Sequence, residues 1–285
     1  MTGTIGIIGY PLAHSISPAF QQAALDFYGM DRRYVLWETP TEDLAKRITA
    51  LRDAETLGAN VTVPHKEAML PYMNSLTDAA REVGAINTIV FKNNDLHGHN
   101  TDVGGFLRAL REDGGFDPTG KHALILGAGG AARAVAYALT RAGLGLLTIA
   151  NRSEERAWRL IIDLGISTNA QVVPLEAPMR PSATGWDLIV NCTTLGMQHS
   201  LGENKSPLAE GSLSQHSLLF DLVYNPEETP FLRTASRLRN RTLGGLPMLI
   251  YQGAEAFQLW TGLEAPIGVM FQAARRALEM KGLIS

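Results

Sequence analysis

The feature that most constrains the fold is a glycine-rich loop that joins an apolar segment to an alanine-rich one. The loop runs from Gly127 to Ala132 (GAGGAA), after the apolar run 122–126 and before a helical pattern over 131–142 and a second apolar run over 146–150. A strand, a glycine turn, a helix and a second strand form a βαβ unit with two parallel strands. The sequence therefore predicts a doubly wound parallel sheet of five or six strands. Its remaining strands are expected at 171–175, 186–192 and 218–223, with helices at 153–164 and 230–239.

The same loop has the composition of a site for a dinucleotide. Gly127 permits the tight turn, and Gly129 lets the backbone approach a pyrophosphate. The helix that begins there offers backbone N–H groups and the positive end of its dipole. Ala132 takes the third glycine position of G-x-G-x-x-G, which the loose form of the motif accepts. The alternative is that these small residues only pack a helix on a sheet, but the strand before them and the helix after them favour nucleotide binding.

The end of the second strand of this unit indicates which nucleotide. A strand that binds the ribose of NAD ends in Asp or Glu, whereas here the strand ends in residues 150–153 (ANRS). Arg152 and Arg156 can pair with a 2′-phosphate, and the Ser153 hydroxyl can donate to it, so NADP is favoured over NAD. Ser153 is also an ordinary helix N-cap, and the two glutamates that follow suit a first helical turn with or without a phosphate.

A separate domain is expected before this unit. Short β-rich runs alternate with helical patterns in the first hundred residues, and Asn93-Asn94-Asp95 reads as a hairpin turn between two such runs. A helix over 103–112 and a turn-rich connector over 117–120 follow, and the chain ends in two helical patterns at 248–260 and 267–281. We therefore expect a first domain over 1–103, a Rossmann domain over 104–245, and C-terminal helices over 246–285 that pack back on the first domain. The resemblance described below implies that the first domain is the substrate-binding catalytic domain.

Lys66 ends the segment 60–66 (NVTVPHK), whose alternating strand pattern stops at Pro64. Proline suits the first position of a helix, so Lys66 is expected in a first helical turn. A cation there opposes the helix dipole, which would lower its pKa and make it a better proton donor near neutral pH. The alternative for Lys66 is a solvated surface lysine.

Asp102 precedes the predicted helix 103–112, so its simplest role is an N-cap. A carboxylate beside Lys66 would also orient the ammonium group and stabilise its charge, which completes an acid/base pair. Short hydroxyl or amide side chains near predicted strand ends and helix starts are a set that can hold a polyhydroxylated ring, although each alone fits a cap or a turn equally well. They are Ser15, Ser17, Asn60, Thr62, Asn87 and Gln252.

Composition excludes several other classes of protein. The 285 residues carry 25 Lys and Arg against 28 Asp and Glu, so no global basic field attracts nucleic acid or an anionic membrane. The single cysteine, Cys192, excludes an internal disulfide and a thiolate metal cage, and it is expected to be a buried apolar residue in the strand 186–192. The histidine spacings give no support for a metal. Because no signal peptide or membrane span is recognisable, a cytoplasmic protein is expected.

Taken together, the motifs resemble the shikimate dehydrogenase family along nearly the whole chain and in the right order. The segments that carry the resemblance are HSISP at 14–18, NVTVPHK at 60–66, GAINT at 84–88, NTD at 100–102, the glycine loop with NRS at 151–153, residues 191–197, residues 221–226 and QGA at 252–254. Two departures are Gln21-Gln22, where the family usually has His-Asn, and Ser153, where it usually has Thr. We interpret the first as a change in helix packing, whereas the second keeps the hydroxyl.

The resemblance implies an α/β fold, in which an N-terminal α/β substrate domain is completed by the C-terminal helices and is followed by a Rossmann-type doubly wound parallel sheet. It implies reversible reduction of 3-dehydroshikimate to shikimate by NADPH in the cleft between the domains, with Lys66 and Asp102 as the catalytic pair. The implied contacts to shikimate are Ser15, Ser17, Thr62, Asn87, Tyr224 and Gln252. The implied contacts to NADP are Gly127, Ala128, Gly129, Gly130, Ala131, Asn151, Arg152, Ser153 and Arg156, with Leu222 and Gly245 near the nicotinamide.

Three rival functions remain at this point. The nearest is a quinate/shikimate dehydrogenase that uses NAD, against which the strand end at 150–153 argues. An enzyme like methylenetetrahydrofolate dehydrogenase would leave Ser15, Ser17 and Gln252 without a role. A non-catalytic dinucleotide-binding sensor would need neither a proton donor nor its partner. The expected partner is a small molecule, with no nucleic acid, no membrane and no metal, and the expected assembly is a monomer or a homodimer.

Overall fold

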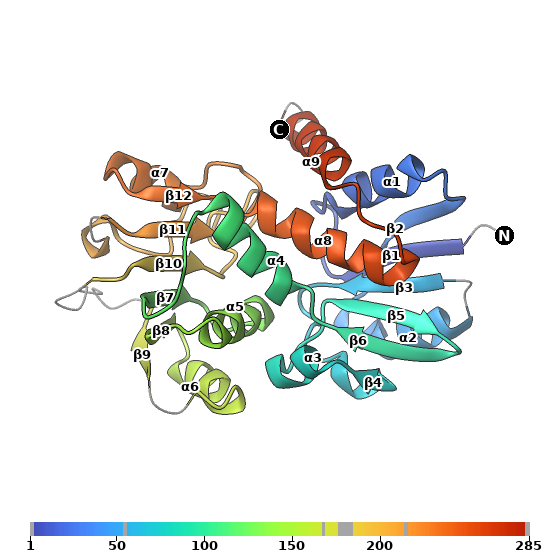
Figure 1. The fold of residues 1–285 in the computed structure, drawn as a ribbon, viewed down its shortest axis with the longest axis horizontal. Coiled ribbons are helices and arrows are strands. Elements are labelled where there is room, and N and C mark those ends of the chain that lie inside the picture. The colour runs from blue at the N-terminus through green and yellow to red at the C-terminus, as the bar shows by residue number, and fades with distance from the viewer. Residues whose placement is uncertain (1–2, 54–55, 167–168, 176–184, 214–215, 283–285) are drawn as a thin grey trace. The chain divides into compact units, whose positions relative to one another are not determined.

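The computed structural model describes residues 3–53, 56–166, 169–175, 185–213 and 216–282. The chain forms two compact units, one built from the residues up to Gly105 and from Ile250 onward, the other from Phe106–Leu249 (Figure 1). Both units are α/β, as the sequence predicts, and each has its own sheet. Within the described ranges, no helix is long and apolar enough to cross a bilayer.

The first unit contains a mixed six-stranded sheet in the order β2-β1-β3-β5-β6-β4. Its strands are β1 (Gly3–Gly9), β2 (Arg32–Glu38), β3 (Thr56–Val61), β4 (Ser75–Leu76), β5 (Thr88–Lys92) and β6 (Asp95–His99). Strands β1, β2 and β3 are parallel, whereas β5 and β6 form an antiparallel hairpin. Asn93 and Asn94 make the two-residue turn with φ of 54° and 67°, the conformation that a type I′ turn requires. The predicted hairpin is thereby confirmed.

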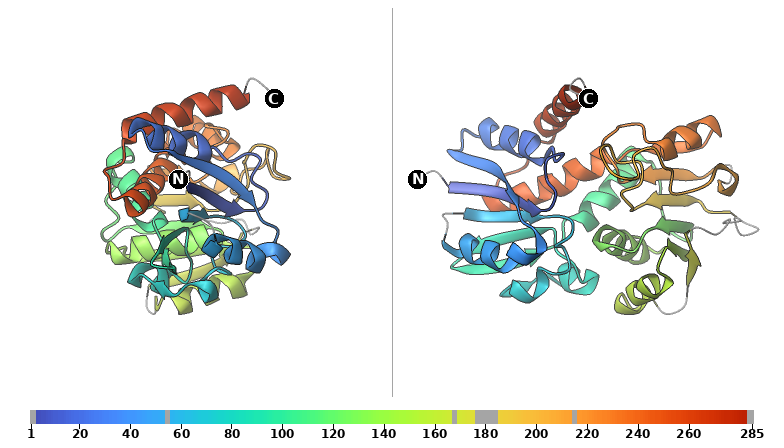
Figure 2. Two further views of the ribbon diagram at one scale, coloured as in Figure 1. Left: turned by 90° about the vertical axis from the view of Figure 1, so that its right-hand side faces the viewer. Right: turned by 180° about the vertical axis from the view of Figure 1, so that it is seen from behind.

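Helices cover both faces of this sheet. Side chains of successive strand residues point to opposite faces, so each face packs against its own set of helices. Ala59 and Val61 pack with α2 (Leu44–Asp53) and α3 (Asp78–Val83) in one apolar core. On the other face, Gly58 leaves room for Trp260 of α8 (Leu246–Thr261), whose Nε1 donates to Ile89 O over 2.9 Å. The helices α1 (Ser17–Phe27) and α9 (Ile267–Gly282) lie side by side (Figure 2).

The second unit is a doubly wound sheet of six parallel strands in the order β12-β11-β10-β7-β8-β9. Its strands are β7 (His122–Leu126), β8 (Leu146–Asn151), β9 (Ala170–Pro174), β10 (Leu188–Asn191), β11 (Leu218–Asp221) and β12 (Arg241–Leu243). Its helices are α5 (Gly130–Arg141), α6 (Glu154–Asp163) and α7 (Pro230–Arg237). The strand order reverses between β7 and β10, and the carboxyl ends of the strands at such a reversal are the usual ligand site of an open α/β sheet.

Two predicted elements differ from the structure. The expected helix 103–112 is α4 (Asp102–Arg108) followed by a π-helical turn, Ala109–Asp113, since the Gly114 N–H bonds back to Ala109 O over 2.9 Å. Cys192 lies one residue beyond β10 rather than inside a strand, and it is half-buried. Desolvation of its sulfur and the nearby Asp221 carboxylate raise the pKa of the thiol, so it is unsuited to act as a nucleophile. Short 3₁₀ turns occur at Thr41–Asp43, Leu70–Tyr72 and Glu210–Ser212.

Candidate active site

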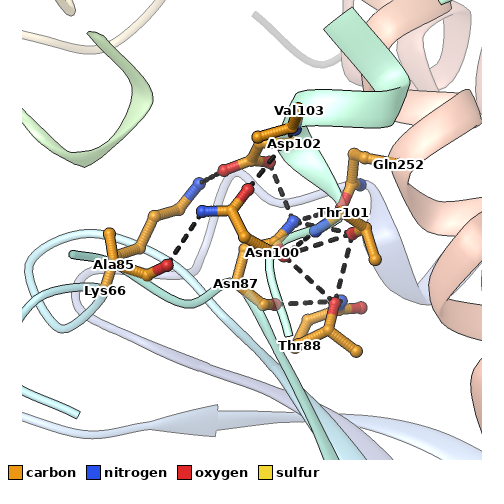
Figure 3. A network of polar contacts seen from close by, with 10 residues as sticks. Lys66, Ala85, Asn87, Thr88, Asn100, Thr101, Asp102, Val103 and Gln252 are labelled. Carbon is orange, nitrogen blue, oxygen red and sulfur yellow. Dashed lines mark hydrogen bonds and ion pairs between the residues drawn. The ribbon is translucent and has the colours of Figure 1, made fainter. Parts of the chain in front are cut away.

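An ion pair joins Lys66 to Asp102 in the first unit. Lys66 Nζ donates to Asp102 Oδ2 over 2.5 Å, and the two side chains keep 15% and 6% of their surface exposed (Figure 3). A pair this close and this shielded is weakly screened, so the carboxylate fixes the position of the ammonium group. The remaining exposure leaves the amine accessible to a small molecule, as a proton donor requires.

Lys66 lies in a single helical turn that does not continue into a helix, so the helix predicted from Pro64 is absent. The chain after β3 forms a series of turns, in which the His65 N–H bonds to Thr62 O and the Met69 N–H to His65 O, each over 2.9 Å. The backbone of Lys66 is held by the Ile86 N–H, which donates to Lys66 O over 2.9 Å. One isolated turn has little of a helix dipole, so the ion pair with Asp102 sets the environment of the lysine.

Asn87 connects the ion pair to the residues around it. Its Nδ2 donates to Asp102 Oδ1 over 2.8 Å, to Thr101 Oγ1 over 2.9 Å and to Gln252 Oε1 over 3.1 Å, and its Oδ1 accepts from the Thr101 N–H over 2.7 Å (Figure 3). Asn87 is 2% exposed, and a buried amide with partners on both its atoms has one orientation. The network therefore fixes the Asp102 carboxylate through the oxygen that Lys66 does not use.

The segment before α4 holds Asp102 at the start of that helix. Asn100 Nδ2 donates to Ala85 O over 2.9 Å, and its Oδ1 accepts from the Val103 N–H over 3.3 Å. The side chain that accepts an N–H of the first turn is thus that of Asn100. Asp102 does not have this role, and it is the first residue of α4. Because Asn100 takes the capping role, both oxygens of Asp102 are left for Lys66 and Asn87.

Gln252 meets this network because α4 and α8 approach each other closely. A Cβ added to Gly105 would lie 2.7 Å from the Gln252 backbone nitrogen, so only glycine at this position of α4 permits the approach. Gln252 is half-buried and contacts Asn87, as the predicted return of the chain end requires. Gly253, the next residue of α8, accepts a hydrogen bond from Gln21 Nε2 over 2.9 Å. Gln21, where the family usually has His, therefore takes part in the packing of α1 on α8, as expected from the sequence.

The other predicted ring contacts lie at the same edge of the sheet but outside this network. Thr62 directly follows β3, and Ser15 and Ser17 follow β1, whose carboxyl end is beside that of β3. Ser15 Oγ accepts from the Ser17 N–H over 3.3 Å. Asn60 has a structural role instead, since its Oδ1 accepts from Tyr34 Oη over 2.6 Å in the buried sheet face.

The glycine loop of the second unit leaves open space in front of α5. Gly127 has φ of 107°, and a Cβ there would lie 3.2 Å from Thr193 Cγ2 after β10, which places the turn where the strand order reverses. Gly129 is the N-cap of α5, makes no side-chain cap, and has no atom within 4 Å of an added Cβ. Ala132 is fully buried against the sheet, as the third position of the motif requires. The loop and the helix start therefore fit a pyrophosphate.

The end of β8 presents two exposed guanidinium groups. Asn151 Nδ2 donates to Ser153 O over 2.8 Å and holds the turn, and Ser153 caps α6 by accepting the Arg156 N–H over 3.3 Å. Arg152 and Arg156 are exposed, and the ion pairs between described residues do not include them. The strand end carries no carboxylate, so this surface fits a 2′-phosphate better than a ribose hydroxyl.

The chain after β11 is positioned by a buried carboxylate that the sequence reasoning missed. Asp221 is fully buried and accepts from Asn191 Nδ2 over 2.8 Å, from the Val223 N–H over 3.0 Å and from Thr229 Oγ1 over 2.6 Å. Burial raises the pKa of this carboxyl to about 6, although the three hydrogen bonds act to lower it. The signal in the sequence is an aspartate that ends an apolar strand.

Leu222 and Gly245 lie against each other in the second unit. A Cβ at Gly245 would overlap the Leu222 carbonyl oxygen, so this position requires glycine. Tyr224 is half-buried two residues further along, in the second unit rather than the first. The contacts of Leu222, Gly245 and Tyr224 with cofactor or substrate stay predictions.

Comparisons with known proteins identify the family. Residues 7–89 match the family model of the shikimate dehydrogenase substrate binding domain, residues 111–225 match that of shikimate / quinate 5-dehydrogenase, and residues 245–275 match that of the shikimate 5′-dehydrogenase C-terminal domain. The shikimate dehydrogenase (NADP(+)) of Moorella thermoacetica is 47% identical over 280 residues, which are 97% of this chain and 94% of that protein.

Solved structures agree with this assignment. Shikimate 5-dehydrogenase from Thermus thermophilus, in complex with NADP(H) and shikimate, is 41% identical with a TM-score of 0.85, and the match covers 98% of this chain and 100% of that one. The ligand-free 5-ketofructose reductase of Gluconobacter sp. strain CHM43 is 32% identical with a TM-score of 0.84, and the match covers 97% and 99%. The motifs in their order, both folds and the matches along the whole chain place this protein in the shikimate dehydrogenase family.

Proposed function

We propose that this protein catalyses the reversible, NADP-dependent reduction of 3-dehydroshikimate to shikimate. The observation that carries the proposal is the Lys66–Asp102 ion pair, fixed by Asn87 and Gln252, in a chain whose second unit has a phosphate-binding helix start and a cationic strand end. Family membership supports the substrate, since relatives named shikimate dehydrogenase (NADP(+)) match along nearly the full length.

Lys66 and Asp102 would transfer the proton of the reaction. In the reducing direction, Lys66 gives a proton to the oxygen that becomes the C3 hydroxyl, and Asp102 stabilises the ammonium form that donates it. In the oxidising direction, the same amine receives the proton of that hydroxyl. Asn87 keeps the carboxylate in place, so the pair needs little reorganisation during the reaction.

NADP would supply the hydride when bound. The start of α5 would hold its pyrophosphate through backbone N–H groups, with Gly129 leaving the necessary space. Arg152 and Arg156 would bind the 2′-phosphate, and Asn151 would hold the turn that carries them. We further propose a cytoplasmic location, on the basis of the single cysteine.

The proposal is tested by following loss of NADPH absorbance with candidate carbonyl substrates. We expect rapid oxidation of NADPH with 3-dehydroshikimate and a much lower kcat/KM with 5-ketofructose, the substrate named for one structural neighbour. A preference for 5-ketofructose would replace the proposed function with that of a different reductase on the same fold.

Substitutions at the end of β8 should change the preference for NADP over NAD. Replacing Arg152→Ala together with Ser153→Asp removes a phosphate partner and supplies an acceptor for a ribose hydroxyl, while aspartate keeps the cap of α6. We expect the ratio of kcat/KM for NADP to that for NAD to fall by at least about tenfold, equivalent to about 1.4 kcal/mol. Arg233→Ala, which removes an exposed arginine from α7, is the matched control. An unchanged ratio would mean that the phosphate is recognised elsewhere.

Gln252→Ala should weaken the binding of shikimate selectively. Loss of the amide leaves a substrate hydroxyl or carboxylate without a partner, which costs about 1–3 kcal/mol, so KM for shikimate rises while KM for NADP stays nearly constant. Gln258→Ala removes an exposed glutamine from the same helix and serves as the control. If both variants gave wild-type kinetics with shikimate, Gln252 would not be a substrate residue.

A further inference from the structure

The helix α8 carries one charged residue, and it faces the first turn of the helix that holds Asp102. Glu255 is the only Asp, Glu, Lys or Arg in Leu246–Thr261, and it follows Gln252 by three residues, so both side chains lie on neighbouring positions of one helix face. Its carboxyl lies against the first turn of α4.

Two adjacent glycines of α4 create the space for this helix face. A Cβ at Gly104 would overlap Oε2 of Glu255, and a Cβ at Gly105 would lie 2.7 Å from the backbone nitrogen of Gln252. Each glycine inside a helix costs about 0.5–1 kcal/mol relative to alanine. Gly105, three residues beyond Asp102, is therefore explained by the close approach of the Gln252 backbone. Gly104, two residues beyond Asp102, meets only the flexible end of the Glu255 side chain and marks where that carboxyl lies.

We propose that Glu255 is a positioning residue for the Lys66–Asp102 pair. Its carboxylate, beside Gly104, sets by its charge how tightly the pair retains its proton. The catalytic consequence of this inference rests on the proposed function. The effect of the Glu255 charge on the Lys66 amine does not. Glu255 does not have to touch the substrate, because a negative charge beside Asp102 stabilises the Lys66 ammonium at a distance.

The charges around Glu255 support this role. Desolvation of its carboxyl and repulsion from Asp102 raise the pKa of Glu255 to about 7, and the residue as a whole is exposed, so it can exchange protons with solvent. On α4 the facing charge is Asp102, which is itself paired with Lys66.

The other elements packed on α8 bring few charges. On α1 the contacts are neutral, from Phe20 and Gln21 to Gly253. On α9, Phe271 packs against the titratable Tyr251 of α8, and the guanidinium of Arg275 lies over that phenylalanine ring, 5.8 Å from its centroid.

The sign of the effect follows from the charges. Above about pH 7 Glu255 is an anion and stabilises the protonated form of Lys66. Oxidation of shikimate requires the deprotonated form of the pair as proton acceptor, so its rate rises with pH. Glu255→Gln removes the anion, and the rise should therefore move to lower pH by about 0.5 unit or more, the size expected for one partly screened charge.

The test measures kcat/KM for shikimate as a function of pH, together with the reactivity of the Lys66 amine toward acetic anhydride followed by peptide mass. We expect both profiles of Glu255→Gln to shift to lower pH relative to wild type, with KM for NADP unchanged. Glu264→Gln removes an equal charge from the exposed loop after α8 and should leave both profiles in place. Gly104→Ala, which displaces the carboxyl, should shift them in the same direction but have no further effect in the Glu255→Gln background.

Two results would overturn the inference. One is a Lys66 reactivity profile of Glu255→Gln that superimposes on wild type, and the other is a uniform loss of activity at every pH without a shift. A protein that fails to oxidise shikimate but shows the shift in Lys66 reactivity would refute the proposed function and leave the electrostatic role of Glu255 standing.

Discussion

Lys66→Ala should lower kcat for shikimate oxidation by at least about 10²-fold, the lower end of what general acid–base catalysis contributes. In the proposed mechanism the amine exchanges a proton with the substrate oxygen. Asp102 lies 2.5 Å from it, and 15% of the lysine side-chain surface remains exposed. Substrate affinity should change much less than kcat, because the ring contacts come from other side chains.

The measurement needs variants that separate chemistry from folding. Removal of Lys66 leaves the buried Asp102 carboxylate without its cation, which destabilises the first unit. Lys66→Arg keeps an ion pair, but its guanidinium group stays protonated, so the variant should fold like wild type and still lose most of kcat. Lys92→Ala, at the exposed end of β5, is the matched control. A Lys66→Arg or Lys66→Ala protein with near wild-type kcat would remove Lys66 from the mechanism.

Asp102→Asn should also lower kcat by about 10²-fold, with the fold maintained. Asparagine keeps an acceptor for the Asn87 amide, which donates to Asp102 over 2.8 Å, but it withdraws the negative charge that stabilises the Lys66 ammonium. Steady-state kinetics of Asp102→Asn against Asp78→Asn, an exposed aspartate that begins α3, measures the effect.

The double variant decides whether the two residues act together. Because paired groups work as one unit, the loss in the Lys66→Ala, Asp102→Asn protein should be close to the larger single loss rather than their product. Fully multiplicative losses in kcat would instead assign Lys66 and Asp102 to separate tasks.

Regular features of the fold are predictable because they leave local signals in the sequence. The parallel sheet follows from apolar runs separated by helical patterns, the β5–β6 turn from Asn93-Asn94, and the start of α6 from the capping residue Ser153. The strand 122–126 and the glycine loop are equally local, since the glycines and the helix that they begin are neighbours in the chain.

The active-site network is not local and could be predicted only in part. Asn87 is bonded to residues 14, 15 and 165 positions away, so no window of sequence contains the arrangement. The helix expected at Lys66 is wrong because proline at a strand end is compatible with turns as well as with a first helical turn. The glycines at 104 and 105 become informative only when Gln252 and Glu255 of α8 are placed against them.

The most direct test of the account is the initial rate of oxidation for shikimate and quinate, each with NADP and with NAD. We expect the highest kcat/KM for shikimate with NADP, at least about tenfold above that for shikimate with NAD, because Arg152 and Arg156 offer partners to a 2′-phosphate and no carboxylate ends β8. A higher kcat/KM for quinate with NAD, or no oxidation of shikimate with either nucleotide, would contradict it.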